Sequence, residues 1–138
     1  MIAVEAPEHL SWEGDRMVLR QALLNLVDNA IKYTPERGQI IVRVVDAGVQ
    51  YLVEVADTGP GIPENLQARV FDRFYRGDES RSQPNGGAGL GLSIAKWATE
   101  ACGGRLTVEK TADHGSTFRI TLPALAADQT PVAPQTNR

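Results

Sequence analysis

The chain has 138 residues, 42% of them hydrophobic, which is enough for one domain with a single core and too short for two ordinary domains. Its formal net charge is −3, so it lacks the basic surplus with which nucleic-acid binders neutralise phosphates. Cys102 is the only cysteine, which excludes an internal disulfide, and no apolar run approaches the roughly twenty residues that span a bilayer. We therefore expect a cytoplasmic domain that contacts neither nucleic acid nor a membrane.

Hydrophobic periodicity and the positions of Gly, Pro and capping residues predict the order of the elements. Asp15 can cap the first long helix, and Pro35 disfavours helical geometry at Thr34 and so ends it. Gly103 and Gly104 can stop a second long helix. The elements that we expect are strands at 2–6 and 10–12, a helix at 16–33, a hairpin of strands at 39–45 and 49–56, a short helix at 63–70, a helix at 90–101, and strands at 105–110 and 116–122.

Two segments lack a periodic apolar face. The polar, glycine-rich segment 77–87 predicts a mobile loop that acts as a lid. Residues 124–138 are rich in Ala, Pro, Gln and Thr and predict a disordered tail, so that the domain proper covers residues 1–123. The other elements predict an α+β fold, a two-layer sandwich in which helices pack on one face of a mostly antiparallel mixed sheet.

A polar stripe on the first long helix is the first candidate site. At about 100° per residue, Asn25, Asn29 and Lys32 lie within a narrow wedge of the helix. An amide oxygen can ligate Mg²⁺, and Lys32 can meet a phosphate as a point charge. On the stripe alone, a solvated helix face is the commoner explanation.

Asp57 is the second candidate, because it ends a hydrophobic strand and enters the turn T-G-P-G. Gly59 and Gly61 in this turn let the backbone approach a flat ligand. An ionised carboxylate could accept a hydrogen bond from the exocyclic amine of adenine. An Asx turn that closes the strand is the commoner explanation of the residue by itself.

The glycine-rich segment 86–92 leads directly into the second long helix, whose N-terminus favours an anion. Glycines alternating with small residues are common in ordinary turns, so the segment alone is a weak signal. It lacks the ending of a P-loop and does not follow a strand as a dinucleotide-binding motif does, which disfavours both of these motifs. Arg76 lies at the start of the expected lid, where its guanidinium could reach a terminal phosphate or simply face solvent. His9 and His114 share no metal-ligand spacing and are assigned no chemistry.

Four motifs in this order resemble the catalytic and ATP-binding domain of bacterial sensor histidine kinases, in the superfamily shared with DNA gyrase, MutL and the heat-shock chaperones. The N box is similar to NLVDNAIKYTP at 25–35, and the first glycine box to DTGPGI at 57–62. The F box is similar to FDRFYR at 71–76, and the second glycine box to GAGLGLSIAK at 87–96. The resemblance covers nearly the whole chain and implies the Bergerat fold, although Ala88 stands where many members have threonine.

The resemblance implies a role for each residue of these motifs. Asn29 would ligate Mg²⁺ with Asn25 alongside, and Asp57 would bind the adenine amine. The catalytic residues would be Asn29, Lys32 and Arg76, the last two at the phosphates. The remaining contacts with ATP that the resemblance implies are Tyr33, Gly59, Gly61, Ile62, Gly87, Ala88, Gly89, Leu90, Gly91, Leu92 and Thr117.

The function that the resemblance implies is transfer of the γ-phosphate of MgATP to a histidine on a separate dimerisation domain. Neither His9 nor His114 is in an H-E-x-x-T-P type context, so the acceptor would lie on that domain and the response regulator would be reached through the full-length kinase. The isolated domain is expected to be a monomer and the parent kinase to lie in the inner membrane. Two alternatives stay open: an anti-sigma-factor-type serine kinase of the same fold, against which FDRFYR argues, and a nucleotide-binding switch without transfer.

Overall fold

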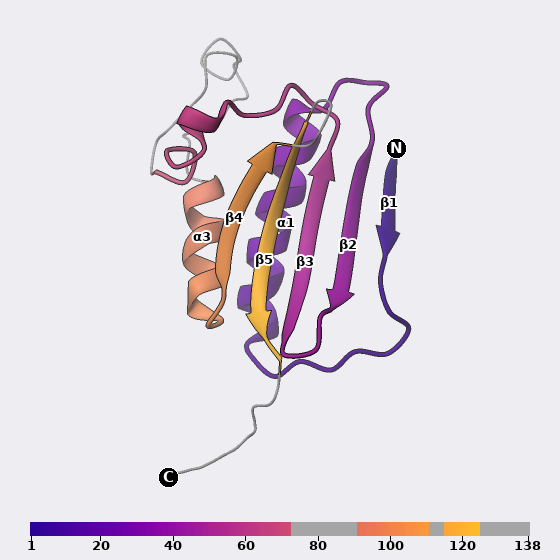
Figure 1. Ribbon diagram of the computed structural model, residues 1–138, viewed down its shortest axis with the longest axis vertical. Helices are drawn as coiled ribbons and strands as arrows, with labels where there is room; N and C mark the ends of the chain where they lie inside the picture. Colours follow the sequence, from indigo (N-terminus) through magenta and orange to yellow (C-terminus); the bar gives the residue numbers. More distant parts are fainter. Residues whose placement is uncertain (73–90, 111–114, 125–138) are drawn as a thin grey trace.

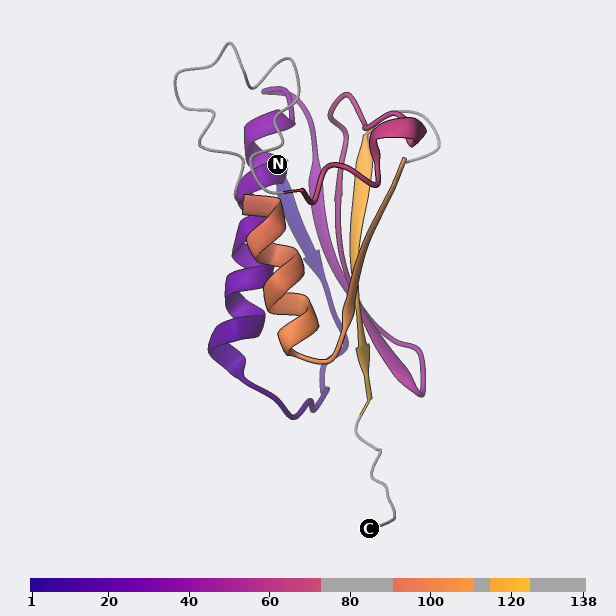
Figure 2. The same ribbon diagram turned by 90° about the vertical axis from the view of Figure 1, so that its left-hand side faces the viewer.

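A computed structural model of the protein describes residues 1–72, 91–110 and 115–124. Within these residues the fold is a two-layer sandwich (Figures 1 and 2). Two long helices, α1 (Arg16–Tyr33) and α3 (Gly91–Ala101), lie side by side on one face of a five-stranded sheet. This arrangement confirms the α+β class that the sequence predicts.

The strands follow the order β1-β2-β3-β5-β4 across the sheet. Only the pair of β1 and β2 is parallel among the described strands, and the other three neighbouring pairs are antiparallel. The central position of β3 places its end between strands from both halves of the chain. The bounds are β1 (Ile2–Glu5), β2 (Ile40–Asp46), β3 (Gln50–Asp57), β4 (Arg105–Lys110) and β5 (Ser116–Pro123).

The bounds of α1 follow from its two ends. The carboxylate of Asp15 accepts hydrogen bonds from the N–H groups of Met17 at 2.9 Å and Val18 at 3.2 Å, which satisfies two donors that have no partner within the helix. Thr34 leaves the helical region with ψ of 129°, immediately before Pro35. The predicted helix at 16–33 is therefore confirmed, and the other long helix and the hairpin strands agree with their predictions within one residue.

The core lies between the two layers. Ala95 and Ala98 of α3 are fully buried, and their small side chains let α3 pack close to α1. On the sheet side, Phe118 and Ile120 of β5 are 1% and 0% exposed, and Phe71 meets the ring of Phe118 edge to face at 6.0 Å between centroids. Burial of a side chain such as Ile120 stabilises the fold by about 2 kcal/mol.

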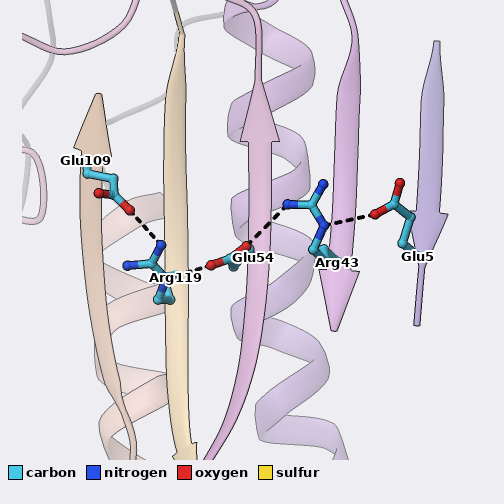
Figure 3. Close-up of polar contacts among 5 residues, drawn as sticks. All are labelled: Glu5, Arg43, Glu54, Glu109 and Arg119. Atoms are coloured by element: carbon cyan, nitrogen blue, oxygen red, sulfur yellow. Dashed lines mark hydrogen bonds and ion pairs between the residues drawn. The ribbon is translucent and has the colours of Figure 1, made fainter. Parts of the chain in front are cut away.

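The opposite face of the sheet carries a ladder of alternating charges that crosses every strand described here (Figure 3). Arg43 lies between Glu5 at 2.9 Å and Glu54 at 3.5 Å. Arg119 continues the ladder, because it lies 2.7 Å from Glu54 and 2.6 Å from Glu109. Exposed pairs of this kind contribute about 0–1 kcal/mol each, so the ladder helps to fix the strand register more than it stabilises the core.

Residues 10–12 do not form the strand that the sequence predicts. The indole of Trp12 lies over Gly14, in the space that a Cβ at Gly14 would need, and it packs against the core. Because this packing folds the chain back on itself, the segment is an irregular connection from β1 to α1.

The helix predicted at 63–70 is only a three-residue 3₁₀ helix, η1 (Glu64–Leu66), followed by turns. Pro63 lies at the N-cap with ψ of 144°, outside the helical region, and not at the first helical position. The backbone bonds run from each residue to the third before it, as from Leu66 N–H to the carbonyl of Pro63 at 2.8 Å and from Arg69 N–H to that of Leu66 at 3.0 Å. Such tight turns cannot propagate as an α-helix, so this prediction was wrong in type and length.

Several predictions concern residues that the structure does not describe. These are the lid at 77–87, the tail beyond residue 124 with the domain boundary that it sets, and the site residues at 76 and 87–90. They stay predictions. In the part of the chain that is described, no helix combines the length and the apolar character that crossing a membrane requires.

Candidate nucleotide site

The candidate site lies where α1 ends, β3 ends and β5 begins, toward the upper end of the molecule in Figure 1. In the sheet register, Asp57 of β3 is paired with Ser116 of β5. A Cβ on Gly59 would lie 2.8 Å from the carbonyl oxygen of Tyr33, so the turn after β3 rests directly on the end of α1. The fold thus brings together segments that are far apart in the sequence.

Asp57 is the buried charged group of this site, with 6% of its surface exposed. Its Oδ1 accepts hydrogen bonds from the N–H of Gly59 at 2.9 Å and of Ser116 at 3.3 Å, and neither bond uses Oδ2. Burial raises the pKa of the Asp57 carboxyl, and the two N–H bonds offset part of the rise. The Asx turn expected from the sequence is present, as the bond from Gly59 to Asp57. An Asx turn that only closes a strand needs neither the second bond from Ser116 nor the burial of the carboxylate.

The geometry around Asp57 also depends on Gly115. Its φ is +100°, and a Cβ there would overlap the carbonyl of Asp57. A side chain is therefore excluded both by conformation and by space. Gly61 in turn lies against Gly115, since a Cβ on Gly61 would come 3.0 Å from the carbonyl oxygen of Gly115. The bare backbone of Gly115 thus lies directly against Asp57.

The polar stripe of α1 is not a plain solvated face, because Asn25 and Asn29 are half-buried and only Lys32 is exposed. The amide nitrogen Nδ2 of Asn25 is buried and has no hydrogen-bond partner among the residues that the structure describes. A buried donor of this kind costs about 1–3 kcal/mol unless a ligand or water satisfies it. Lys32 lies 5.8 Å from the ring centroid of Tyr33, which brings its ammonium toward the same end of the helix.

Asn25 also connects the stripe to α3. A Cβ on Gly91, the first residue of α3, would lie 3.8 Å from Oδ1 of Asn25. The predicted phosphate loop therefore enters its helix beside the predicted metal-binding stripe. Of the other predicted contacts, Tyr33 is half-buried, and Ile62 and Leu92 pack against the core.

Ser116 is a candidate site residue that the sequence did not single out, whereas Thr117 was predicted. Ser116 is 4% exposed and is paired with Asp57, whereas Thr117 is paired with Ala56. Because side chains alternate along a strand, the side chain of Thr117 is on the other face of β5, with Arg119. The geometry thus favours Ser116 as the hydroxyl beside Asp57. The pairing of two strands that are distant in sequence was the missing information.

The residues present fit a cation only if a ligand shares it. Among the described residues, no group of three His, Cys, Asp or Glu side chains could hold a metal ion. Asn25 and Asn29 offer neutral amide oxygens, which suit Mg²⁺ when substrate phosphates and water complete its shell. The site therefore suits an anionic ligand with Mg²⁺ better than a metal ion alone.

Comparison with known proteins shows the family of the chain. The family described as histidine kinase-, DNA gyrase B- and HSP90-like ATPase matches residues 14–126. The chain is 41% identical over 124 residues to the sensor-like histidine kinase SenX3 of Mycobacterium tuberculosis, which covers 90% of this chain and 30% of SenX3. It spans between 13% and 30% of the length of the curated relatives that it matches.

Solved structures give the same result at the level of the fold. The mycobacterial sensor histidine kinase MprB superimposes with a TM-score of 0.76 at 35% identity, over 89% of this chain and 84% of that one. Full-length ShkA in complex with AMPPNP superimposes with a TM-score of 0.76 at 34% identity, over 91% of this chain and 26% of ShkA. The chain therefore belongs to the histidine kinase-, DNA gyrase B- and HSP90-like ATPases, and among them to the catalytic ATP-binding domains of sensor histidine kinases.

Proposed function

We propose that this domain binds MgATP and donates the γ-phosphate to a histidine on a separate dimerisation domain of the same kinase. The observation that carries the proposal is the buried carboxylate of Asp57, which ends β3 against the bare backbone of Gly115 and close to the end of α1. A buried carboxylate beside bare backbone suits a flat ligand with an amine on its edge. The complex of ShkA with the adenine nucleotide AMPPNP supports the assignment.

Asp57 recognises the adenine base of the nucleotide in this proposal. An ionised carboxylate only accepts hydrogen bonds, so it pairs with the exocyclic amine of adenine and has no donor for the carbonyl that guanine carries at the same position. Tyr33, Gly61 and Ile62 border the base in this proposal. Ser116, in place of Thr117, supports the adenine end.

The phosphate end lies along the stripe of α1. Asn29 is the proposed Mg²⁺ ligand with Asn25 beside it, and Lys32 and Arg76 neutralise phosphate charge. The N–H groups of residues 87–92 receive phosphate at the start of α3. Mg²⁺, when bound, offsets charge on the phosphate oxygens. Catalysis in this proposal is mostly positioning and charge neutralisation.

The partners in this proposal follow from the kinase relatives. The acceptor histidine is on the dimerisation domain, and a response regulator receives the phosphoryl group through the full-length kinase. The isolated domain is a monomer that works in the cytoplasm, and the parent kinase is anchored in the inner membrane. The relatives reported above are named as sensor histidine kinases, and this supports a place in two-component signalling.

The test is transfer of a radiolabelled γ-phosphate. The chain alone with MgATP is compared with the chain plus the histidine-bearing dimerisation domain of its parent kinase. We expect acid-labile label on the added domain and none on the isolated chain. Transfer should be slow, because two free domains lack the effective concentration that a covalent link provides.

Each other outcome contradicts a different part of the proposal. Acid-labile label on His9 or His114 of the isolated chain would show that the acceptor is not on a separate domain. Acid-stable label on a serine of the added protein would favour the anti-sigma-factor-type serine kinase. ATP binding without transfer, even to the covalently linked parent domain, would favour the nucleotide-binding switch.

A further inference from the structure

At the candidate site, Thr58 extends the pairing of β2 and β3 by one residue, with a side-chain oxygen in place of a backbone acceptor. The last pair of β2 and β3 is Ile40 with Asp57, and the next two residues, Gln39 and Thr58, also face each other. The N–H of Thr58 donates to the carbonyl of Gln39 at 3.1 Å, as in a regular ladder. The return bond differs, because the N–H of Gln39 donates to the side-chain oxygen Oγ1 of Thr58 at 2.9 Å. A hydroxyl thus replaces a backbone carbonyl as the acceptor.

This replacement lets the chain turn immediately after Asp57. In a regular antiparallel pair the two residues exchange both backbone bonds, which keeps both strands extended. Because the hydroxyl takes the bond from Gln39, the carbonyl of Thr58 is released and the backbone can bend at Gly59. The bend is what allows the N–H of Gly59 to return to Oδ1 of Asp57 at 2.9 Å.

The same hydroxyl contacts the loop that follows α1. A Cβ on Gly38 would lie 2.7 Å from Oγ1 of Thr58 and would overlap the methyl group of Thr34. The N–H of Gly38 donates to the carbonyl of Pro35 at 2.8 Å, so this loop is itself a closed turn. Thr58 is therefore fixed between the loop after α1 and the turn after β3.

From these contacts we infer that Thr58 is a positioning residue for base recognition. Its hydroxyl sets the place of the Asp57 carboxylate relative to the end of α1 and so determines how well the site distinguishes adenine from a base with a carbonyl at the same position. Thr58 acts through Asp57 and touches no nucleotide itself. The inference rests on the proposed binding of adenine by Asp57.

The test compares two nucleotides that differ at this edge of the base. Calorimetry gives the affinities of the chain for ADP and for IDP, whose base carries a carbonyl where adenine has the amine. Thr58→Val removes the acceptor and keeps the shape of the side chain, and we expect it to lower the preference for ADP over IDP about fivefold. Thr58→Ser retains the hydroxyl and should keep the preference within about twofold of the parent.

The ratio of the two affinities separates positioning from loss of structure. In a variant that is only partly folded, the apparent affinities for ADP and IDP fall by the same factor, so the preference for ADP over IDP is unchanged. Thr107→Val, the same substitution on the edge strand β4, is the matched control and should leave both affinities unchanged. If Thr58→Val does not fold, Thr58→Ala removes the same acceptor with less bulk against Gly38.

Two results would overturn the inference while the proposed function stands. One is an unchanged preference for ADP in a folded Thr58→Val or Thr58→Ala variant. The other is a Thr58→Ser variant that loses as much preference as the valine variant, which would mean that the hydroxyl is not the acting group. A parent chain that binds neither nucleotide would instead overturn the proposed function, and this inference with it.

Discussion

The backbone N–H of Ser116 donates to Oδ1 of Asp57 at 3.3 Å, across 59 positions of the sequence. This bond joins the start of β5 to the end of β3 at the point where the first glycine box turns away from the sheet. This bond and the one from Gly59 both go to Oδ1, so Oδ2 is the oxygen that we expect to accept the adenine amine. The proposed recognition of adenine depends on this arrangement.

Asp57→Asn should lower the affinity for ADP and ATP by about 10- to 150-fold, because the loss of a charge-assisted hydrogen bond costs about 1.5–3 kcal/mol. Asp46→Asn is a matched control, because Asp46 forms the same turn by accepting the N–H of Gly48 at 3.0 Å but is exposed at the end of β2. Calorimetric titration checks both variants. Equal affinities for ATP in the two variants would contradict the role of Asp57.

The same substitution should change how stability depends on pH. Burial raises the pKa of Asp57 in the folded state above its ordinary value of 3.8. The folded protein therefore holds the proton of Asp57 more tightly than the unfolded chain does. The contribution of this tighter binding to the free energy of unfolding is fully present below the unfolded pKa and is lost as pH rises through the folded pKa. Asp57→Asn removes this titration.

We therefore expect the free energy of unfolding of Asp57→Asn to increase relative to the parent as the pH rises above about 4. Urea denaturation without nucleotide, repeated at increasing pH, measures the difference. A difference that stays constant with pH would mean that the pKa of Asp57 is not raised in the folded state.

The ends of the elements were predictable because local chemistry sets them. The carboxylate of Asp15 and the ring of Pro35 fix α1 without help from the rest of the chain. The strand predicted at 10–12 failed because the burial of Trp12 is a tertiary effect. Ser116 was missed for the same kind of reason, since the register of β3 on β5 decides which of two adjacent hydroxyl residues meets Asp57.

Asn29→Ala should reduce the enhancement of ATP binding by Mg²⁺ and leave the fold intact, because alanine is a good helix former. Asp28→Ala is the neighbouring control, since Asp28 is exposed on the same helix. ATP titrations with Mg²⁺ and with EDTA measure the enhancement for each variant. If Mg²⁺ enhances binding by Asn29→Ala as much as by the parent, Asn29 is not its ligand.

Arg119→Gln should lower the free energy of unfolding by about 1 kcal/mol, and the loss should shrink at high salt. The reason is that Arg119 pairs with Glu54, whose side chain is only 12% exposed, as well as with Glu109. Arg105→Gln on the exposed edge strand is the control. Urea denaturation at two salt concentrations measures the free energy of unfolding of both variants. An equal loss of this free energy in Arg105→Gln would show that the charge ladder is not the cause.

The most direct test of the central claim, that nucleotide binds where α1, β3 and β5 meet, is an NMR titration of the labelled chain with MgATP. We expect large shifts for the side-chain amide of Asn25, whose Nδ2 is buried with no partner in the described part of the chain, and for the backbone amides of Gly59 and Ser116. The Nε–H signals of Arg43 and Arg119, on the opposite face of the sheet in Figure 3, should not move. Shifts confined to the arginines, or saturable binding that leaves Asn25, Gly59 and Ser116 unchanged, would contradict the account.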